Sequence, residues 1–291
     1  MGRPERPAEL AEALAQRAYL ADRGLVTALH LAHRLGRPLL LEGDAGVGKT
    51  EAAKTMADVL GAKLVRLQCY EGIDRAQALY AWDHPRQLLH VRTLEASGER
   101  PDQHESELYT RRFLLPRPLL TALEAGAGAV LLVDEIDRAD DEFEAFLLEI
   151  LSDFQVSIPE LGTITAAEPP LVILTSNRTR ELSEALRRRC LYHWIDHPDV
   201  EREAAIVRVR VPDVPEAVAR RIAGVVAKLR ALDLHKTPGV AETVDWARVA
   251  VDLGGDLDAQ TAADTLGVVV KDRDDLATVR AVLDEVVEVE A

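Results

Sequence analysis

The stretch from residue 43 to residue 50 contains the residue types that hold a polyphosphate. It fits the pattern GxxxxGK[ST] and consists of Gly43, Asp44, Ala45, Gly46, Val47, Gly48, Lys49 and Thr50. Glycines allow backbone N–H groups to turn toward an anion, and a helix that begins at the end of the stretch adds the positive end of its dipole. Lys49 is expected to reach the β- and γ-phosphates, and the Thr50 hydroxyl to ligate Mg²⁺. The pattern therefore predicts a nucleotide-binding loop.

Two acidic residues follow an apolar stretch, 129–133, that we expect to form a buried strand. Ligands of open α/β sheets bind beside the carboxyl ends of the strands, which is where these acids would lie. We expect Asp134 to hold Mg²⁺ through water, and Glu135 to orient or deprotonate an attacking water. The alternative is a strand that ends at a charged turn. Three more acids, interpreted as solvating the start of a helix and not as metal ligands, are Asp137, Asp140 and Asp141.

A polar amide and a run of arginines complete the candidate chemistry. Asn177 follows the apolar stretch 171–175, where its side chain could bind both a γ-phosphate and the attacking water. Its alternative role is that of a helix cap or turn former. The run Arg187–Arg189 ends a helix expected over 181–189, and the helix dipole favours cations there. In a ring of chains, one of these arginines could reach a neighbour's γ-phosphate and stabilise the charge of the transition state.

Apolar stretches that alternate with helical patterns predict the scaffold for these residues. The expected strands are 38–41, 63–67, 129–133, 171–175 and 191–195. The expected helices before residue 198 are 8–23, 25–35, one that ends at 60, 74–80, 86–96, 118–125, 140–152 and 181–189. This alternation indicates an α/β fold with a parallel sheet, and residues 154–158 and 163–165 predict a β-hairpin. The clearest helical segments after residue 200 are 218–232, 243–253 and 276–287. We therefore expect an α/β domain, 1–197, and a small all-helical domain, 198–291.

Composition counts against several classes of protein. The chain of 291 residues carries a net charge of −15, which is unfavourable for a general nucleic-acid binder, because phosphate contacts need a surplus of Lys and Arg. Its two cysteines, Cys69 and Cys190, lie far apart in the sequence and predict neither a disulfide framework nor a thiolate metal site. The sequence has neither an apolar stretch of about 18 residues nor a signal-peptide pattern. We therefore expect no membrane association and a cytoplasmic location.

In this order, the motifs resemble those of AAA+ ATPases. The hairpin before Asn177 is similar to the pre-sensor hairpin of the clade that contains MoxR proteins. Three runs, CYEGIDRAQALYAW, EFEAFLLEILSDFQVSIPELGTI and LTSNRTRELSEALRRRC, resemble the CoxD-like accessory ATPases, which serve the maturation of carbon monoxide dehydrogenase and related molybdenum hydroxylases. The resemblance covers about residues 20–290. It implies a P-loop AAA+ core with a parallel sheet and a pre-sensor β-hairpin, followed by a small all-helical lid domain.

The resemblance also implies roles for single positions. The matching positions are Lys49 and Thr50 for Walker A, Asp134 and Glu135 for Walker B, Asn177 for sensor 1, and Arg189, or alternatively Arg188, for the arginine finger. Many MoxR relatives carry a sensor 2 arginine in the lid, but here Thr243 occupies its expected position and Arg248 follows one helical turn later. Residues 88–94 resemble the helix-2 insertion of the clade, which is either a surface for contacting a client or an ordinary packed helix.

The activity implied by the resemblance is that of an ATP- and Mg²⁺-dependent ATPase that remodels a client protein. The implied assembly is a homo-oligomer, usually a hexameric ring, that works with a von Willebrand factor A domain protein. The implied client is a metalloenzyme whose molybdenum site is being completed. Two alternatives stay open: a nucleic-acid motor such as a clamp-loader or helicase subunit, and a nucleotide switch that does not hydrolyse ATP. The net charge counts against the first, and Glu135 with Asn177 counts against the second.

Overall fold

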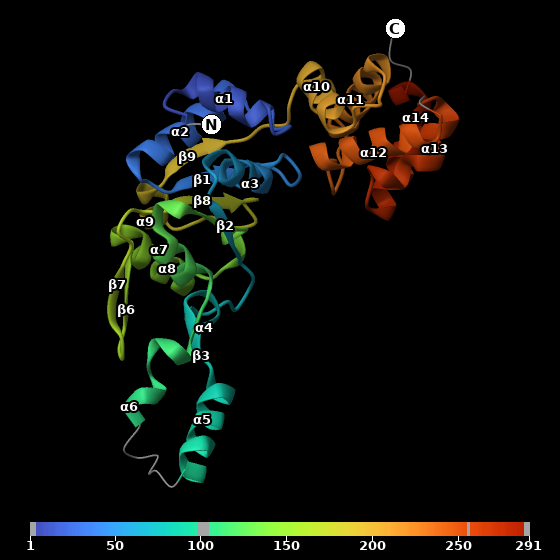
Figure 1. Ribbon diagram of the computed structural model, residues 1–291. Coiled ribbons are helices and arrows are strands. Elements are labelled where there is room, and N and C mark those ends of the chain that lie inside the picture. The colour runs from blue at the N-terminus through green and yellow to red at the C-terminus, as the bar shows by residue number, and fades with distance from the viewer. Residues whose placement is uncertain (1–3, 98–104, 255–256, 288–291) are drawn as a thin grey trace. The chain divides into compact units, whose positions relative to one another are not determined.

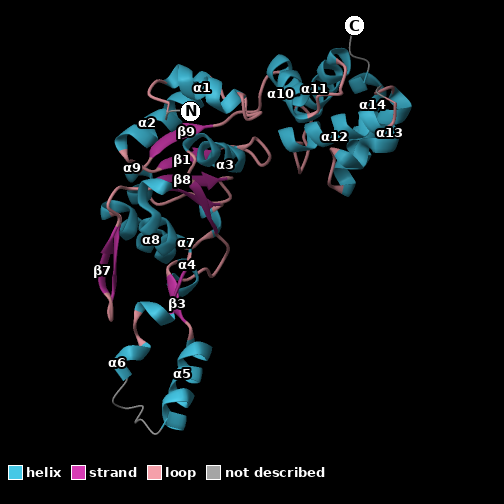
Figure 2. Cartoon of the chain, in the orientation of Figure 1, coloured by secondary structure: helices cyan, strands magenta, loops and turns pink. Residues whose placement is uncertain are grey.

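The computed structural model describes residues 4–97, 105–254 and 257–287 (Figures 1 and 2). The chain divides into two compact units. The first draws on the segments 1–10, 23–42 and 53–193, and the second on the segments 11–22, 43–52 and 194–291. The glycine-rich loop is therefore grouped with the C-terminal helices. The predicted domain boundary at residues 197 and 198 stays a prediction.

The first unit is built on a five-stranded parallel sheet with the strand order β2-β5-β8-β1-β9. The strands are β1 (Leu39–Glu42), β2 (Lys63–Gln68), β5 (Ala129–Asp134), β8 (Leu171–Ser176) and β9 (Leu191–Trp194). Every expected strand is present, because short apolar runs bounded by polar residues are typical of buried parallel strands. The predicted α/β fold with a parallel sheet is confirmed.

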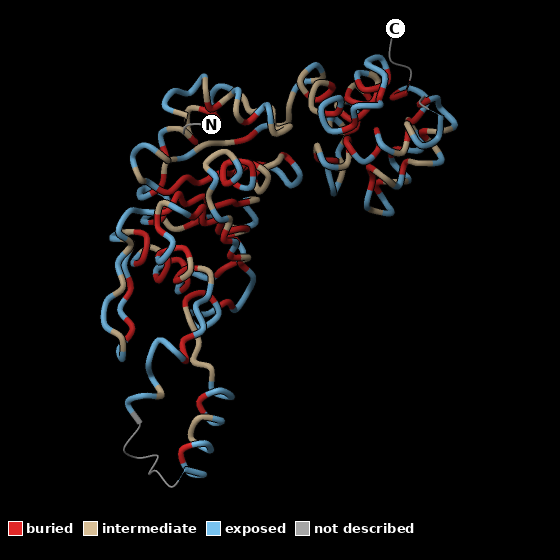
Figure 3. Tube along the Cα trace, viewed as in Figure 1, coloured by how far each residue is buried: buried red, intermediate tan, exposed pale blue. Residues whose placement is uncertain are grey.

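Helices cover both faces of this sheet. Alternate residues of a strand face opposite sides, so Leu131 and Val133 of β5 join a core with α7 (Pro118–Ala125) and α8 (Asp141–Asp153). On the other face, α2 (Arg23–Leu35) packs against β1 and β8, and Figure 2 shows the sheet between α2 and the pair α7 and α8. Figure 3 shows that buried residues follow the strands. Each buried Val or Leu side chain stabilises the fold by about 1.5–3 kcal/mol, which fixes the positions of the strand ends.

The remaining helices that lie wholly or partly in the first unit differ from the expectation at several ends. They are α1 (Pro7–Ala15), α3 (Lys49–Leu60), α4 (Arg75–Ala78), α5 (His84–Ser97), α6 (Glu105–Leu108) and α9 (Glu184–Arg189). The expected helix over 8–23 ends early, and Ala18 adopts a positive φ of 59°. The expected helix over 181–189 begins late, because the Ser183 side chain accepts a hydrogen bond from the N–H of Leu186 and caps the helix there. The polar composition of residues 97–107 predicts a loop there, of which residues 98–104 lie outside the described residues.

The helix predicted over 74–80 is wrong after residue 78. Residues Tyr80–Trp82 form strand β3, which pairs antiparallel with β4 (Leu114–Pro116), a strand that was not predicted. The rings of Tyr80 and Trp82 contact each other edge to face at 5.9 Å between centroids. Cross-strand pairing and aromatic contact outweigh the local helical pattern here, because strand preference depends on neighbouring side chains.

A second pair of antiparallel strands lies next to α8. It consists of β6 (Gln155–Ile158) and β7 (Gly162–Thr165), with Val156 opposite Ile164. Phe154 ends α8 in the left-handed conformation, with φ 48°, and so turns the chain directly into β6. The predicted hairpin is therefore confirmed.

The C-terminal part of the second unit is helical. Its helices are α10 (Val200–Arg210), α11 (Glu216–Arg230), α12 (Val240–Asp252), α13 (Ala259–Thr265) and α14 (Arg273–Val287). They surround a core that contains the fully buried Trp246, whose indole N–H donates to the Thr265 hydroxyl at 2.8 Å. Within the described residues, no strand follows β9, so the predicted helical region is confirmed.

Both cysteines are buried free thiols. Burial raises the pKa of Cys69 and of Cys190 to about 12, so neither thiol ionises near neutral pH. None of the helices within residues 4–97, 105–254 and 257–287 combines the length and the apolar character that crossing a lipid bilayer would take.

Candidate functional site

The glycine-rich loop of the second unit turns sharply because its glycines adopt backbone angles that other residues avoid. Gly43 has φ +156° and Gly46 has φ +82°. A Cβ atom at Gly46 would lie 2.8 Å from the Cα of Gly239, so the loop approaches the start of α12 too closely for a side chain. Helix α3 begins at Lys49, and the N–H groups of its first turn favour an anion. The loop therefore has the backbone features that phosphate binding needs.

The ammonium group of Lys49 is held by the loop itself. The residue is only 6% exposed, and its Nζ donates to the carbonyl oxygens of Gly43 and Asp44, each at 2.7 Å. These two carbonyls fix the positive charge at the loop, where an anionic ligand would meet it. The carbonyl oxygens of the first two loop residues thus meet at one cation.

Two contacts from other segments of the second unit hold the loop in place. The Tyr19 hydroxyl donates to the carbonyl oxygen of Gly48 at 3.3 Å, and the N–H of Val240 donates to the carbonyl oxygen of Gly46 at 3.1 Å. Burial raises the pKa of Tyr19, so its hydroxyl keeps the proton that it donates. The first turn of α12 and the segment after α1 therefore both support the loop. The sequence pattern identified neither contact.

His197 lies against the side chain of Asp44 in the same loop. Its Nε2 is 3.4 Å from the Asp44 Oδ2. Burial, together with the positive charge of Arg230, lowers the pKa of His197, so the imidazole is neutral at pH 7. This contact therefore leaves the negative charge of Asp44 uncompensated at neutral pH.

The position expected for a sensor 2 arginine is part of the helical core. Thr243 is fully buried, and its hydroxyl donates to Glu203 Oε1 at 2.6 Å. Arg230 donates to both oxygens of Glu203, at 2.6 and 2.7 Å, and this ion pair is buried as well. Arg248, one turn further along, is exposed and pairs with Asp245. Within this unit, Thr243 therefore completes a buried ion pair.

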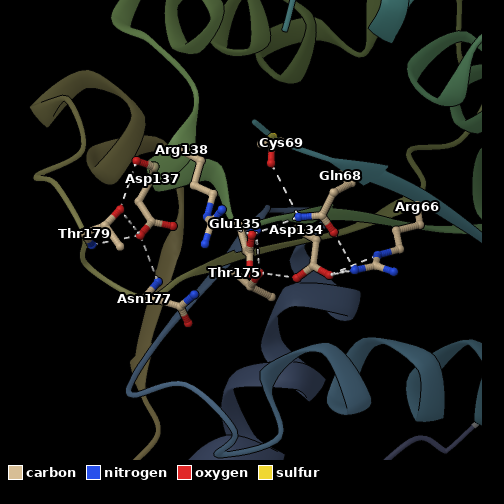
Figure 4. A network of polar contacts seen from close by, with 10 residues as sticks. All are labelled: Arg66, Gln68, Cys69, Asp134, Glu135, Asp137, Arg138, Thr175, Asn177 and Thr179. Carbon is tan, nitrogen blue, oxygen red and sulfur yellow. Dashed lines mark hydrogen bonds and ion pairs between the residues drawn. The ribbon is translucent and has the colours of Figure 1, made fainter. Parts of the chain in front are cut away.

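In the first unit, Asp134 ends β5 with a carboxylate that is almost completely buried (Figure 4). Arg66 of β2 donates to its Oδ2 from Nε at 3.0 Å and from Nη2 at 2.6 Å. The Thr175 hydroxyl of β8 donates to its Oδ1 at 2.6 Å. The carboxylate is thus held by side chains from the strands on either side of β5, which is what a buried charge requires.

Glu135 follows directly and adopts the left-handed conformation, with φ 55°. Its N–H donates to the Thr175 hydroxyl oxygen at 2.9 Å, so that one hydroxyl serves both acids. Its Oε2 accepts from Gln68 Nε2 at 3.1 Å and lies 3.0 Å from Arg138 Nε. Figure 4 shows Gln68 between Arg66 and Glu135. The two acids therefore share Thr175, and each carboxylate has an arginine among its partners, Arg66 for Asp134 and Arg138 for Glu135.

Asp137 is a positioning residue and does not solvate a helix start, so that prediction is wrong for this residue. Its side chain is 2% exposed, and its Oδ2 accepts from the N–H groups of Asn177 and Thr179, at 3.2 and 2.9 Å. It also accepts from the Thr179 hydroxyl at 2.8 Å. The carboxylate therefore fixes the loop after β8 that carries Asn177.

For Asp140 the expectation holds, because this residue caps α8 by accepting from the N–H of Phe143.

All three arginines at the end of α9 are exposed. Arg187 pairs with the buried Glu42 at 3.1 Å, and Arg188 pairs with Glu184 one helical turn earlier. Arg189 donates to the carbonyl oxygen of Ser152 at the end of α8. Arg187 thus has a role within the chain that the helix dipole alone did not indicate. The finger role of Arg189, with Arg188 as the alternative, stays a prediction.

The parallel register places three strand ends at one edge of the sheet. Val133, before Asp134, pairs with Leu174, while Glu42 at the end of β1 pairs with Ser176. Asn177 follows Ser176, and Gly43, the first loop residue, follows Glu42. This edge is the one where open parallel sheets bind ligands.

Comparison with known families identifies the first part of the chain. The description "AAA domain (dynein-related subfamily)" matches residues 38–190, which is more than half of the chain. The denitrification regulatory protein NirQ of Pseudomonas aeruginosa is 25% identical over 260 residues, which cover 87% of this chain and 90% of NirQ. The chaperone MoxR1 of Mycobacterium tuberculosis is 29% identical over 194 residues, which cover 65% of this chain but only 42% of MoxR1.

Among solved structures, the RuvB Holliday junction branch migration motor of Thermotoga maritima has a similar fold. It superposes with a TM-score of 0.50 at 19% sequence identity, over 98% of this chain and 79% of RuvB. A variant of the same protein gives a TM-score of 0.51 at 19% identity, over 99% of this chain and 80% of the variant. At this identity, the likeness concerns the fold alone.

Sequence reasoning missed five residues that hold the acids and Asn177: Arg66, Gln68, Arg138, Thr175 and Asp137. Arg66 and Gln68 alternate along β2 and so share a face of the sheet, but this pattern has meaning only once β2 is known to lie beside β5. Thr175 follows four apolar residues of β8, and its hydroxyl after that run is the local signal that could have found it. Asp137 lies three residues after Asp134 and was assigned to the helix start by its sequence position.

Replacing Asp137 with alanine tests its positioning role. The Asp137→Ala variant removes the carboxylate that accepts from two partly buried N–H groups and a hydroxyl, so we expect the free energy of unfolding to fall by about 1–3 kcal/mol. Urea denaturation measures the change. Asp141→Ala is the control, because Asp141 is 92% exposed in its pair with Arg180 and should change stability by less than about 0.5 kcal/mol. Equal losses in the two variants would contradict the role given to Asp137.

Proposed function

The chain belongs to the AAA domain family, dynein-related subfamily, and from this membership we propose that it binds ATP with Mg²⁺ and hydrolyses it. The observation that carries the proposal is the shared sheet edge. Asp134 ends β5 there, Asn177 follows β8 there, and the strand that leads into the glycine-rich loop ends there. Scattered polar residues of a scaffold protein would have no reason to converge on this edge.

The predicted metal-binding side chains suit Mg²⁺. The ion prefers hard oxygen ligands, and Thr50 and Asp134 offer a hydroxyl and a carboxylate. Asp134 is buried, and a buried carboxylate requires a positively charged partner, which Arg66 provides at one oxygen in the absence of the ion. When bound, Mg²⁺ supplies charge neutralisation at the phosphates.

Residues of the chain carry out the other parts of the reaction. Lys49 and the backbone N–H groups of the loop bind the phosphates. Glu135 accepts a proton from the attacking water or orients it, and Asn177 donates its amide to the γ-phosphate and positions the same water. In this proposal, Arg189 of one subunit stabilises the charge that develops at the site of the next.

We propose that the hydrolysis cycle remodels a client protein, as a chaperone does. The similarity to the chaperone MoxR1 supports this activity. The finer proposal, that the client is a molybdenum-containing metalloenzyme whose site is being completed, rests on the three sequence runs that resemble the CoxD-like ATPases. A cytoplasmic homo-oligomeric ring, usually of six subunits, and a von Willebrand factor A domain partner belong to the same proposal.

In this proposal, a contact within the second unit transmits nucleotide binding at the loop to the C-terminal helices. The carbonyl oxygen of Gly46 in the loop accepts from the N–H of Val240 in α12. A change in the loop on phosphate binding or release therefore acts directly on the first turn of a lid helix. The fold likeness to RuvB adds no support for action on DNA, and the net charge of −15 counts against it.

Lys49→Ala tests the phosphate loop. We expect ATP affinity to fall by at least about 100-fold, because a charge-assisted hydrogen bond contributes about 1.5–3 kcal/mol and the phosphates carry several negative charges. Isothermal titration with ATP measures the change. The control is Lys54→Ala, which removes an exposed lysine from the same helix. Unchanged affinity in Lys49→Ala would refute the role of the loop.

Glu135→Gln separates binding from hydrolysis. The amide keeps the shape of the carboxylate but cannot accept the proton, so turnover should fall by about 100-fold or more while ATP binding persists. Phosphate release and ATP titration measure the two effects. Proteins captured on the ATP-bound variant, and absent from a parallel capture on Lys49→Ala, would identify the client. Turnover at the wild-type rate would exclude Glu135 as the base.

Mixing two inactive variants tests the shared site. Arg189→Ala should bind ATP yet lose about 1,000-fold in turnover, the range found for arginine fingers. In rings mixed with Lys49→Ala, some interfaces combine an intact loop with an intact Arg189, so part of the phosphate release should return. Recovery only in mixtures that contain Arg188→Ala would assign the finger to Arg188. If neither mixture recovers, the shared-site proposal fails.

A further inference from the structure

Glu42 is the last residue of β1, and its carboxylate is buried. The residue is 1% exposed, and Gly43 of the glycine-rich loop follows it directly in the chain. Arg187 Nη2 donates to its Oε2 at 3.1 Å, and the Ser176 hydroxyl at the end of β8 donates to its Oε1 at 3.4 Å. Burial, and a hydrogen bond from its hydroxyl to Glu42, raise the pKa of Tyr192 of β9. This carboxylate therefore connects β1 with β8, β9 and α9.

Arg187 supplies the positive charge that the Glu42 carboxylate needs. The other polar groups that contact this carboxylate within the described part of the chain are uncharged hydroxyls. The side chain of Glu42 is 2% exposed, whereas that of Arg187 is 40% exposed. A buried carboxylate without a cation is costly, so Glu42 holds the guanidinium in place. The position of Arg187 is therefore set by a group that cannot turn into water.

Helix α9 lies on the face of the sheet toward which Glu42 points. Glu42 and Leu40 are two residues apart on β1 and so share a face, and Leu40 belongs to the same core as Leu186 of α9. Leu186 is the buried residue of this helix of six residues. One buried leucine stabilises the packing by about 1.5–3 kcal/mol but leaves the helix free to turn about it. Polar contacts are therefore needed to fix the last turn.

The main chain at the end of α9 is bound from the other end of β1. Arg37, which precedes β1, donates from Nη2 to the carbonyl oxygens of Arg188 and Arg189, each at 3.1 Å. The N–H of Leu191 then donates to the carbonyl oxygen of Pro38 at 2.7 Å. The first of these contacts holds the backbone of the arginine run, and the second holds the chain directly after it. Strand β1 therefore binds the last turn of α9 from both of its ends.

We propose that Arg187 is a positioning residue for the arginine finger, and that its pair with Glu42 ties the last turn of α9 to the strand that leads into the glycine-rich loop of the same subunit. The finger is Arg189, or alternatively Arg188, and both belong to this turn. The inference rests on the proposed function, because it concerns the arginine that completes a neighbouring site. It adds that a subunit presents this arginine correctly only while the ion pair beside its own loop is intact.

Small displacements of a catalytic group have large effects on rate, because charge stabilisation in the transition state depends on exact placement. Without Arg187, the last turn of α9 keeps the packing of Leu186 and the main-chain bonds from Arg37. The helix therefore stays folded, but the contact that fixes its rotation against β1 is lost. Turnover falls although the finger itself is still present.

Two other roles of the ion pair make different predictions. A pair that only stabilises the fold lowers the free energy of unfolding when it is broken, and leaves the turnover of the folded protein unchanged. A pair that acts on the loop of its own subunit through Glu42 changes the ATP affinity of the subunit that lacks it. A positioning role leaves ATP affinity unchanged and impairs the site of the neighbouring subunit.

The first test compares turnover with ATP affinity in the full-length protein, at a temperature where urea denaturation shows the variant to be folded. In Arg187→Ala we expect phosphate release at saturating ATP to fall by about 10- to 100-fold, while ATP affinity in isothermal titration stays within about two-fold of the wild type. Arg187→Lys keeps a cation for the single contact with Glu42 and should restore most of the turnover. The matched control is Arg34→Ala, which removes an exposed arginine from the last turn of α2 and should leave both quantities unchanged.

Mixed rings locate the defect. When Arg187→Ala subunits are combined with Lys49→Ala subunits, some sites have the intact loop of the first and the correctly held finger of the second. Phosphate release should therefore exceed the sum of the two variants measured separately. Absence of recovery, or a loss of ATP affinity that matches the loss of turnover, would place the defect in the subunit's own loop and overturn the proposal.

Glu42→Gln covers the case in which Arg187→Ala does not fold. The amide fills the same space without a buried charge and no longer attracts Arg187, so turnover should fall in the same direction. In the double variant the two losses should not add, because both substitutions break the same pair. Turnover at the wild-type rate in either folded single variant overturns the role of Arg187 alone, whereas absence of turnover in the wild-type protein refutes the proposed ATPase activity itself.

Discussion

Asp134 is a carboxylate that is almost removed from water, and the polar end of the sheet depends on keeping it partnered. Burial of an isolated charge costs several kcal/mol even after the protein relaxes, roughly as much as the whole net stability of many domains. Here Arg66 from β2 and Thr175 from β8 meet this cost from both sides of β5. Their positions are possible only because parallel strands bring their carboxyl ends to one edge. The need to neutralise Asp134 and the parallel order of the strands therefore both require these side chains to lie at the same edge of the sheet.

The second unit has a different constraint, which is a close approach of two backbone segments. Gly46 in the loop and Gly239 before α12 lie so near each other that neither tolerates a Cβ atom. Thr243, at the position where the resemblance leads us to expect an arginine, belongs to the network of the buried Glu203–Arg230 pair. The start of α12 therefore meets the loop through backbone contact at Gly46, while the side chain at position 243 points into the helical core. In the proposed cycle, this contact would couple the loop to α12 without a sensor 2 arginine.

The features that could be predicted from the sequence are those that depend on the local residue pattern. The apolar runs gave the five strands of the sheet, and the glycine-rich loop and both acids were recognisable by type and spacing. The roles of Arg66 and Asp137 could not be predicted in this way, because they depend on which strands are neighbours in the sheet. The order of the strands is set by packing across the whole unit. The strand Tyr80–Trp82 was missed for the same reason, since its partner lies more than thirty residues later in the chain.

The conformation of Glu135 bears on the choice between a hydrolysing enzyme and a passive nucleotide switch. A residue with a side chain in the left-handed region costs about 1–2 kcal/mol relative to glycine, which is free to adopt it. The chain offsets this cost with the bond from the Glu135 N–H to Thr175, and it orients the carboxylate with Gln68 and Arg138. A turn that served only to end β5 could carry glycine or asparagine without such support. A left-handed residue held by this many contacts is typical of functional positions, and at Glu135 it agrees with the proposed role of this carboxylate in hydrolysis.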